Sequence, residues 1–349
     1  RTGALPLFFL NTGCVESGDF NADGRPDLFV GGRSQPGSYG LSPPSFLLLN
    51  QGGGVFDFAP EALSAAVREL GMVTDAVWLP DSRTLAVVGE WMPLTLLEFT
   101  EAGLRKTTVP DSEGWWNALH AADLDGDGDT DLLAGNMGLN SNLRASPEEP
   151  VRLYVADYDN NLFQDPILTY FRQGREWIYV SKDELVEQLT PLRKKFVEYH
   201  RFAQSPFEQV FSPELLEKAV RREARTFASS WFENRGEAGF VAHALPRAAQ
   251  FAPIYAFLTE DFTRDGRPDI LAVGNFFENP PSIGRYDASF GTFLASRSTA
   301  EWQSIEPRIS GFAAFGEARE LAFLHGRNHR WILIAHNGGG VQVIGERKR

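Results

Sequence analysis

The sequence predicts an all-β fold, a β-propeller of about six to eight four-stranded blades that carries one helical insertion. Three observations support this prediction. A nine-residue, aspartate-rich motif occurs four times, a short apolar run follows each copy, and most repeat units begin 34 to 59 residues apart. That spacing lies near the roughly 40–50 residues of a propeller blade.

The four copies of the motif are DFNADGRPD at 19–27, DLDGDGDTD at 123–131, DYDNNLFQD at 157–165 and DFTRDGRPD at 261–269. Positions 1, 3, 5 and 9 always carry a side-chain oxygen, and alternate residues of a tight loop point inward, so these oxygens can converge on one hard cation. Ca²⁺ tolerates such mixed ligands in flexible geometry better than Mg²⁺ does. We therefore expect three to four structural calcium ions. The candidate ligands are Asp19, Asn21, Asp23 and Asp27; Asp123, Asp125, Asp127, Asp129 and Asp131; Asp157, Asp159, Asn161 and Asp165; and Asp261, Thr263, Asp265 and Asp269.

The second loop differs from an EF-hand at its end. Position 12 is Ala134, where an EF-hand has a bidentate Glu. The ninth-position Asp131 must close the ligand shell instead, and a strand is expected where an EF-hand has a helix.

The apolar runs after the loops predict strands buried on both faces. Two further stretches, 75–90 and 320–337, keep such a run but lack a complete ligand set, which brings the number of repeat units to six. Phe46–Asn50 and Val55–Phe56 flank a glycine turn and predict a hairpin. The runs themselves are 28–30, 132–134, 167–168 and 270–273.

Residues 1–349 are predicted to form a single propeller domain with a helical insertion at 181–233, because 104 residues separate the third loop from the fourth. Ser181 and Glu184 form a capping box. Ser212, Pro213 and Glu214 provide a cap, an N1 proline and a first-turn acid, and predict a helix from about Glu214 to Ala228.

Composition narrows the function. The formal charge of −13 argues against nucleic acid as a partner. No apolar run is long enough to predict a transmembrane segment. Cys14 is the single cysteine, so calcium rather than a disulfide is the expected staple. The chain starts at Arg1 without a signal-like segment, which suggests a processed product whose targeting sequence lay upstream.

The loops followed by apolar strands resemble the FG-GAP/VCBS repeats of integrin α-chain-like β-propellers, over nearly the whole chain except the insertion. Segments such as GGRSQPGSYG, GWWNALHAADLDGDGD and GRYDASFG resemble secreted or outer-membrane VCBS-repeat proteins of Gram-negative bacteria that carry an ASPIC/UnbV-like module. The resemblance implies calcium binding, a surface or periplasmic location and a binding role.

Two positions depart from that family pattern. Leu162 stands where the family has Gly, which predicts a strained or reshaped third loop and a weaker metal site. Integrin-like propellers usually have seven blades, whereas six units are visible here. The Leu5–Leu10 stub is therefore a candidate closing strand for the last blade, unless further repeats precede this chain.

A second group of residues follows the buried strands and would gather on one rim of a propeller. It is a candidate ligand face with tryptophans for stacking and asparagines for hydrogen bonding; alternatively, the Gly–Asn pairs form turns and the tryptophans pack between blades. Its members are Arg33, Glu90, Trp91, Trp115, Trp116, Asn136, Asn140, Asn275 and Asn337.

No catalytic motif is evident, because the six histidines show no metal-binding spacing and no nucleophile elbow or phosphate loop occurs. The sequence therefore favours a calcium-stabilised, non-enzymatic propeller, secreted or at the cell surface, that binds a protein or glycan. The alternatives are a carbohydrate-active enzyme, a lyase or a hydrolase, and a structural subunit of a larger envelope complex. The expected location is extracellular, on the outer-membrane surface or in the periplasm.

Overall fold

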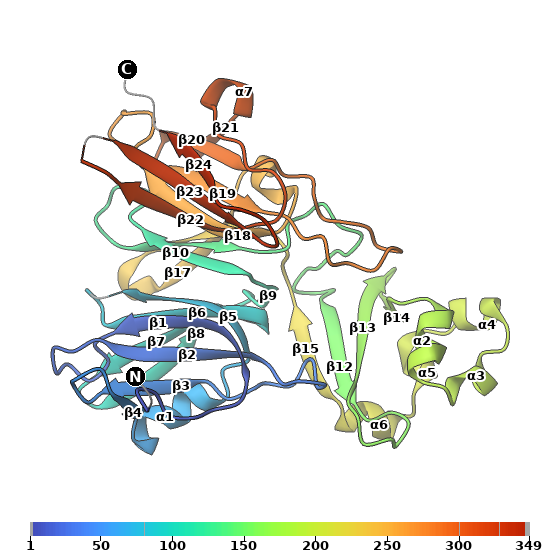
Figure 1. Cartoon of the computed structure of the whole chain (residues 1–349). Coiled ribbons are helices and arrows are strands. Elements are labelled where there is room, and N and C mark those ends of the chain that lie inside the picture. The colour runs from blue at the N-terminus through green and yellow to red at the C-terminus, as the bar shows by residue number, and fades with distance from the viewer. Residues whose placement is uncertain (1–2, 80, 300, 328, 346–349) are drawn as a thin grey trace. The chain divides into compact units, whose positions relative to one another are not determined.

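The computed structural model describes residues 3–79, 81–299, 301–327 and 329–345, and it confirms the all-β class (Figure 1). Pro80 and Asn328, which lie within two of the predicted repeat units, are outside the described residues. The described part contains six antiparallel sheets, four of which are four-stranded, as expected for a propeller-like fold. The chain divides into two compact units. Unit 1 comprises Arg1–Trp115 and Leu143–Thr226, and unit 2 comprises Trp116–Asn142 and Phe227–Arg349.

Unit 1 begins with two meandering sheets. In each, the strands lie side by side in chain order, and the short β9 adds to β6 in the second sheet. Their shared core includes Phe29, Leu47, Leu85 and Leu97, each at most 1% exposed. The elements are β1 (Asn11–Gly18), β2 (Asp27–Ser34), β3 (Phe46–Asn50), β4 (Phe56–Phe58), α1 (Glu61–Arg68), β5 (Met72–Leu79), β6 (Thr84–Met92), β7 (Thr95–Thr100), β8 (Gly103–Thr108) and β9 (Gly114–Trp115).

The third sheet of unit 1 has a different strand order, β14-β13-β12-β15, and short helices pack against it. Tyr154 and Ile167 of the sheet share a core with Leu185, Phe207 and Phe211 of the helices. The elements are β12 (Val151–Ala156), β13 (Asp165–Arg172), β14 (Arg175–Ile178), α2 (Lys182–Gln188), α3 (Leu192–Lys195), α4 (Tyr199–Ala203), α5 (Phe207–Val210), α6 (Pro213–Lys218) and β15 (Val220–Ala224).

Unit 2 contains two four-stranded sheets and one sheet of three strands. Leu133, Ile270 and Leu294 are fully buried between the first two sheets. The elements are β10 (Ala118–Ala122), β11 (Asp131–Gly135), β16 (Ser230–Asn234), η1 (Gly236–Ala238), β17 (Phe240–Ala244), η2 (Arg247–Gln250), β18 (Ile254–Glu260), β19 (Asp269–Gly274), β20 (Thr292–Ser298), β21 (Glu301–Ile305), α7 (Pro307–Ser310), β22 (Ala318–His325), β23 (Arg330–His336) and β24 (Gln342–Gly345).

Each of the six predicted repeat units supplies the first hairpin of one sheet. The four aspartate loops join β1 to β2, β10 to β11, β12 to β13 and β18 to β19, and the two degenerate units form β5–β6 and β22–β23. The strands β11 and β19 are buried along their whole length, as the continuous apolar runs predicted, whereas Leu28 in β2 and Leu168 in β13 are only half-buried. The glycine turn between β3 and β4 is also confirmed.

The insertion is larger than the predicted helical segment. Strand β11 pairs directly with β16, so everything from 143 to 226, including the complete third sheet of unit 1, is inserted within one sheet of unit 2. The capping box at Ser181 and the cap at Ser212 are confirmed. The helix expected to reach Ala228 ends at Lys218, because Val220–Ala224 pairs with β12. The single propeller domain over 1–349 stays a prediction.

The Leu5–Leu10 stub contacts the first sheet. The ring centroids of Phe8, within the stub, and Phe46 are 5.4 Å apart, and the carbonyl of Ala4, which precedes the stub, accepts a hydrogen bond from Phe56 N–H at 2.8 Å. It forms no strand in the described chain, so the closing-strand hypothesis finds no support. Among the described residues, no helix is long and apolar enough to cross a membrane.

His120 gives unit 2 a pH-dependent stability. Its Nε2 lies 2.9 Å from Thr259 Oγ1, and burial lowers its pKa to about 4. The folded state therefore holds the neutral imidazole, whereas the unfolded chain is protonated below its ordinary pKa of about 6.5. The stabilisation is complete above pH 6.5 and is lost as the pH falls toward 4. We expect a loss on the order of 2–3 kcal/mol over that range.

Urea unfolding of the wild type and of His120→Gln at pH 7.5, 5.5 and 4.5 measures this contribution. The difference in free energy of unfolding between the wild type and His120→Gln should become smaller or change sign at low pH. A difference that stays constant with pH would show that His120 does not titrate on unfolding.

Candidate metal centres

The four aspartate loops share one backbone shape, in which positions 4 and 6 have positive φ: 60° and 81° in the first loop, 82° and 94° in the second, 58° and 73° in the third, and 62° and 83° in the fourth. The position-1 carboxylate accepts the position-6 N–H in all of them, at 2.9 Å for Asp19, 3.2 Å for Asp123, 2.8 Å for Asp157 and 2.9 Å for Asp261. The position-5 side chain accepts the position-7 N–H, for example Asp127 from Asp129 at 2.8 Å and Asn161 from Phe163 at 2.8 Å. The turn is therefore held by its own side chains.

The ninth-position aspartate is buried in every loop, from 0% exposed at Asp27 and Asp269 to 6% at Asp165. Asp131 accepts Leu124 N–H at 3.0 Å and, from the third strand of its sheet, Asn234 N–H at 2.7 Å. Asp27 bonds Asn50 N–H and Asp269 bonds Ser296 N–H in the same way, both at 2.8 Å. This carboxylate thus joins the loop hairpin to the next strand.

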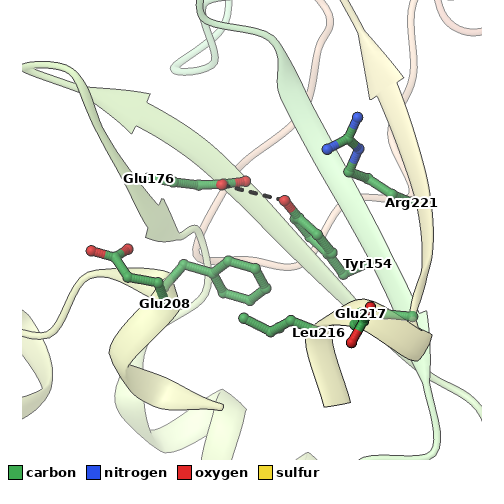
Figure 2. A pocket seen from close by; sticks show the side chains of 8 residues that line it. Tyr154, Glu176, Glu208, Leu216, Glu217 and Arg221 are labelled. Atoms are coloured by element: carbon green, nitrogen blue, oxygen red, sulfur yellow. Dashed lines mark hydrogen bonds between the residues drawn. The ribbon is translucent and has the colours of Figure 1, made fainter. Parts of the chain in front are cut away.

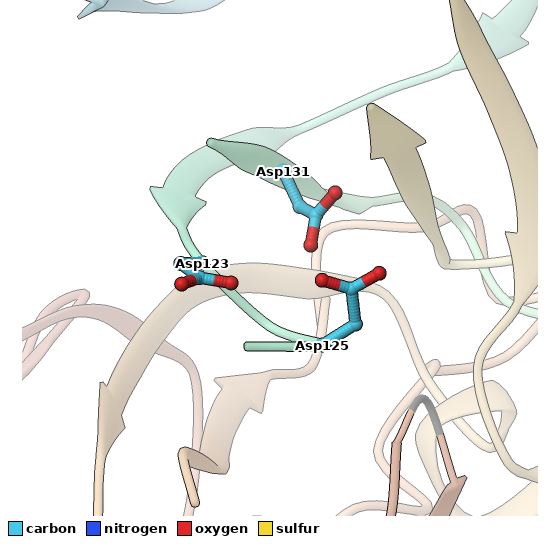
Figure 3. A group of neighbouring side chains, drawn as sticks. All are labelled: Asp123, Asp125 and Asp131. Carbon is cyan, nitrogen blue, oxygen red and sulfur yellow. The ribbon is translucent and has the colours of Figure 1, made fainter. Parts of the chain in front are cut away.

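Carboxylate oxygens converge in two of the loops. Asp123, Asp125 and Asp131 each offer an oxygen, and these oxygens lie within 4.8 Å of one another (Figure 3). Asp157, Asp159 and Asp165 form an equivalent group. Asp159 Oδ1 is buried and has no hydrogen-bond partner among the described residues. Because a buried carboxylate oxygen without a partner is costly, this donor set fits a bound cation.

The first and fourth loops carry an internal cation instead. Arg25 Nη2 lies 2.5 Å from Asp23 Oδ2, and Arg267 Nη2 lies 2.5 Å from Asp265 Oδ2. Position 3 is not a carboxylate in these loops: Asn21 Oδ1 accepts Asp23 N–H at 3.0 Å, and Thr263 N–H donates to Asp269 at 2.8 Å. A metal ion in the first or fourth loop would share its position-5 ligand with an arginine. We therefore expect the second and third loops to bind the metal more tightly.

Burial disfavours ionisation of the ninth-position carboxylates of the first three loops, and this shows in their pKa. It raises the pKa of Asp131 to about 6, and it raises the pKa of Asp27 and Asp165 above the ordinary value. Neighbouring carboxylates, Asp125 and Asp127 in the case of Asp131, act in the same direction. A divalent cation in the loop would reverse both effects.

The sequence predicted that Leu162 either strains or reshapes the third loop. The structure shows that the loop keeps its shape. Its φ of 73° matches the 81° to 94° of the glycines at the same position, and its side chain is 91% exposed. The loop therefore keeps its shape and accepts the strain of a left-handed leucine, on the order of 1–2 kcal/mol.

Replacing Leu162 with Gly should relieve that strain. After the entropy gained by the unfolded chain is subtracted, we expect Leu162→Gly to raise stability by about 0.5–1 kcal/mol. The neighbouring Phe163 is also exposed but has no positive φ, so Phe163→Gly is the matched control and should destabilise. Urea denaturation of both variants measures the difference, and equal losses would contradict the strain.

The predicted rim residues of unit 1 form a hydrogen-bonded cluster at the end of β6. Glu90, 7% exposed, accepts from Arg33 at 2.8 Å and from Tyr39 Oη at 2.5 Å, and Trp91 Nε1 donates to Tyr39 Oη at 3.0 Å. Trp91 is buried with φ of 61°, and its ring lies 5.0 Å from that of Trp115. Sequence reasoning missed Tyr39, which lies in the β2–β3 connection far from Glu90 in sequence.

The rim residues of unit 2 are engaged in internal bonds. Asn275 Nδ2 donates to the Ser289 and Gly316 carbonyls, both at 2.8 Å, and Asn337 Nδ2 donates to Glu317 at 3.1 Å. Glu317, 6% exposed, also accepts from Arg319 and was not predicted. In the same unit, Trp116 is fully buried, Asn136 is buried with its N–H on Ser229 Oγ, and Asn140 Nδ2 donates to the Phe251 carbonyl. A ligand-binding role for these residues stays a prediction.

Known proteins give a limited set of similarities. The FG-GAP repeat model matches residues 115–145, which include the whole second loop and β11. No curated protein matches the chain. Among solved structures, that of Saccharomyces cerevisiae Sqt1 is similar over 91% of this chain and 80% of that chain, with 11% identity and a TM-score of 0.30. Residues 115–145 thus match an FG-GAP repeat, and the chain has an all-β, propeller-like fold.

Proposed function

We propose that this protein is a calcium-stabilised, non-enzymatic binding protein, secreted or at the cell surface, whose loops hold three to four structural Ca²⁺ ions. The observation that carries the proposal is the convergence of three carboxylates in the Asp123 and Asp157 loops, with Asp159 Oδ1 buried and unpartnered among the described residues. Oxygen-only donors in a flexible loop suit Ca²⁺.

The role of the ion follows from the position of each loop. The loop joins the first two strands of a sheet, and its ninth aspartate holds the third strand in three of the four cases. Without a cation, each pair of neighbouring carboxylates repels by about 1–4 kcal/mol before screening. With a cation, the same charges draw the hairpin and the third strand together. Repetition of the loop in four sheets favours a structural role over a catalytic one.

The proposed binding role rests on the family resemblance, and the proposed location rests on the FG-GAP match as well, because FG-GAP repeats are typical of extracellular proteins. The partner would be a protein or glycan at the cell surface. Immobilised, calcium-loaded chain should capture a specific partner from an envelope extract, and EDTA should release it. Turnover of a glycan by the purified chain would instead establish the carbohydrate-active alternative.

A further inference from the structure

An open pocket of about 490 Å³ lies in unit 1, within the segment inserted between β11 and β16. Figure 2 shows it between the short helices α5 and α6 and the strands β12, β14 and β15. The size is typical of a site for a small ligand or for a side chain with its flanking groups. Neither the aspartate loops nor the strand-end clusters contribute to its lining.

The floor of the pocket is apolar and aromatic. Phe207 is 2% exposed and Tyr154 is 8% exposed, with their ring centroids 4.5 Å apart. Leu216 of α6, partly buried, and Ala219 extend the apolar surface. Alkyl groups gain free energy on such a floor, and a cation above the rings gains a further attraction.

The mouth of the pocket is acidic. Glu208 on α5 and Glu217 on α6 are exposed, and neither carboxylate forms an ion pair or hydrogen bond within the described part of the chain. Arg221, the cation in the lining, lies 3.3 Å from Glu223, a carboxylate that Arg152 also contacts at 3.0 Å. The two exposed carboxylates of Glu208 and Glu217 outnumber this one cation of the lining.

Glu176 adds a fixed acceptor at the inner wall. It accepts from Thr169 Oγ1 at 2.6 Å, Arg152 at 3.1 Å and Tyr154 Oη at 3.3 Å. These three donors hold the carboxylate in place beside the aromatic floor. Glu176 is thus fixed by three hydrogen bonds, whereas no such bond fixes the carboxylates of Glu208 and Glu217.

We propose that this pocket binds a lysine or arginine side chain of a partner protein, with the alkyl stem on Phe207 and Leu216 and the charged group at the acidic mouth, to which Glu208 and Glu217 contribute. Long basic side chains combine an apolar stem with a charged end in this way. The net charge of −13 would favour the approach of a basic partner. This inference rests on the proposed binding function and specifies one of its sites.

The test is a titration of the full, calcium-loaded chain with an N-acetylated, C-amidated Gly-Ser-Lys-Ser-Gly peptide, followed by methyl NMR at Leu216 and Ala219. The same peptide with norleucine or glutamate in place of lysine provides the ligand controls. We expect saturable shifts with the lysine peptide, at least about tenfold weaker binding of the norleucine peptide, and no binding of the glutamate peptide.

The double variant Glu208→Gln/Glu217→Gln should bind the lysine peptide about fivefold or more weakly, as expected for the loss of two exposed charge pairs. Glu101→Gln/Glu187→Gln makes the same change of net charge at two exposed sites outside the lining and should alter binding less than twofold. Equal losses in both variants, an unchanged affinity in the first, or equal binding of the norleucine peptide would overturn the proposal. So would shifts at these methyls with an uncharged oligosaccharide in place of the peptide.

A melt of the same samples with and without EDTA separates the two proposals. A calcium-dependent melt without peptide binding would overturn the pocket assignment alone. Peptide binding at the pocket with a calcium-independent melt would overturn the structural calcium ions and leave the pocket.

Discussion

Removing calcium should lower the melting temperature of this protein by more than about 10 °C. At 1 mM free Ca²⁺, a site with a dissociation constant of about 10 μM contributes about 2.7 kcal/mol, and the structure offers two carboxylate clusters and two mixed loops of the same shape. Two or more occupied sites would therefore contribute about 5 kcal/mol or more. For a domain of roughly 150–250 residues, each kcal/mol lost from the free energy of unfolding lowers the melting temperature by about 2–4 °C.

Scanning calorimetry in 1 mM CaCl₂, in 1 mM MgCl₂ and in EDTA measures this effect. Magnesium should restore little of the loss, because it needs stricter octahedral geometry. Re-addition of excess CaCl₂ to the EDTA sample should restore the original transition. Identical melting curves in all three buffers would contradict a structural role for the loops.

Replacing Asp131 with Ala should cost about 3 kcal/mol or more even in EDTA. The side chain is 1% exposed and accepts two backbone N–H groups, from Leu124 and Asn234. Each buried donor left without a partner costs about 1–3 kcal/mol. In calcium the loss should be larger still, because the same carboxylate closes the predicted ligand shell.

Two further variants separate these contributions. Asp131→Asn keeps one oxygen acceptor and should therefore lose less stability in EDTA than Asp131→Ala does. The stabilisation gained on adding calcium should be reduced equally in both variants. Asp81→Ala, in the exposed turn of a repeat unit without a ligand set, should change stability by less than about 0.5 kcal/mol. Equal effects of Asp81→Ala and Asp131→Ala would refute the role of the ninth-position aspartate as a link between strands.

The sequence was informative where the signal was local and repeated. The loop positions and the strand after each loop follow from nine consecutive residues and the apolar run behind them, and six hairpins appear where six units were expected. The caps at Ser181 and Ser212 were likewise readable, because a capping pattern involves only neighbouring residues.

Long-range features could not be predicted in the same way. The pairing of β11 with β16 joins residues about a hundred positions apart. No local pattern predicts such a pairing, so the insertion of a whole sheet between these strands could not be inferred from the sequence. The same holds for the bond from Asp131 to Asn234 and for the contact of Tyr39 with Glu90. The helix expected up to Ala228 ended early because β12 offered strand pairing to Val220–Ala224, and tertiary context overrides local propensity in such cases.

The pocket on the insertion had no sequence signal, because its floor and mouth come from five separate elements. Its aromatic residues looked like ordinary core positions, and its glutamates looked like a solvated face. By contrast, the asparagines singled out at the strand ends are occupied with internal bonds in unit 2.

The most direct test of structural calcium is the metal content of the folded chain. Protein purified in CaCl₂ and then dialysed against metal-free buffer should retain three to four calcium ions per chain by elemental analysis. Asp131→Ala should retain one fewer, and Asp81→Ala should retain the full number. A wild-type chain that retains no calcium, yet melts as it did before dialysis, would contradict the account.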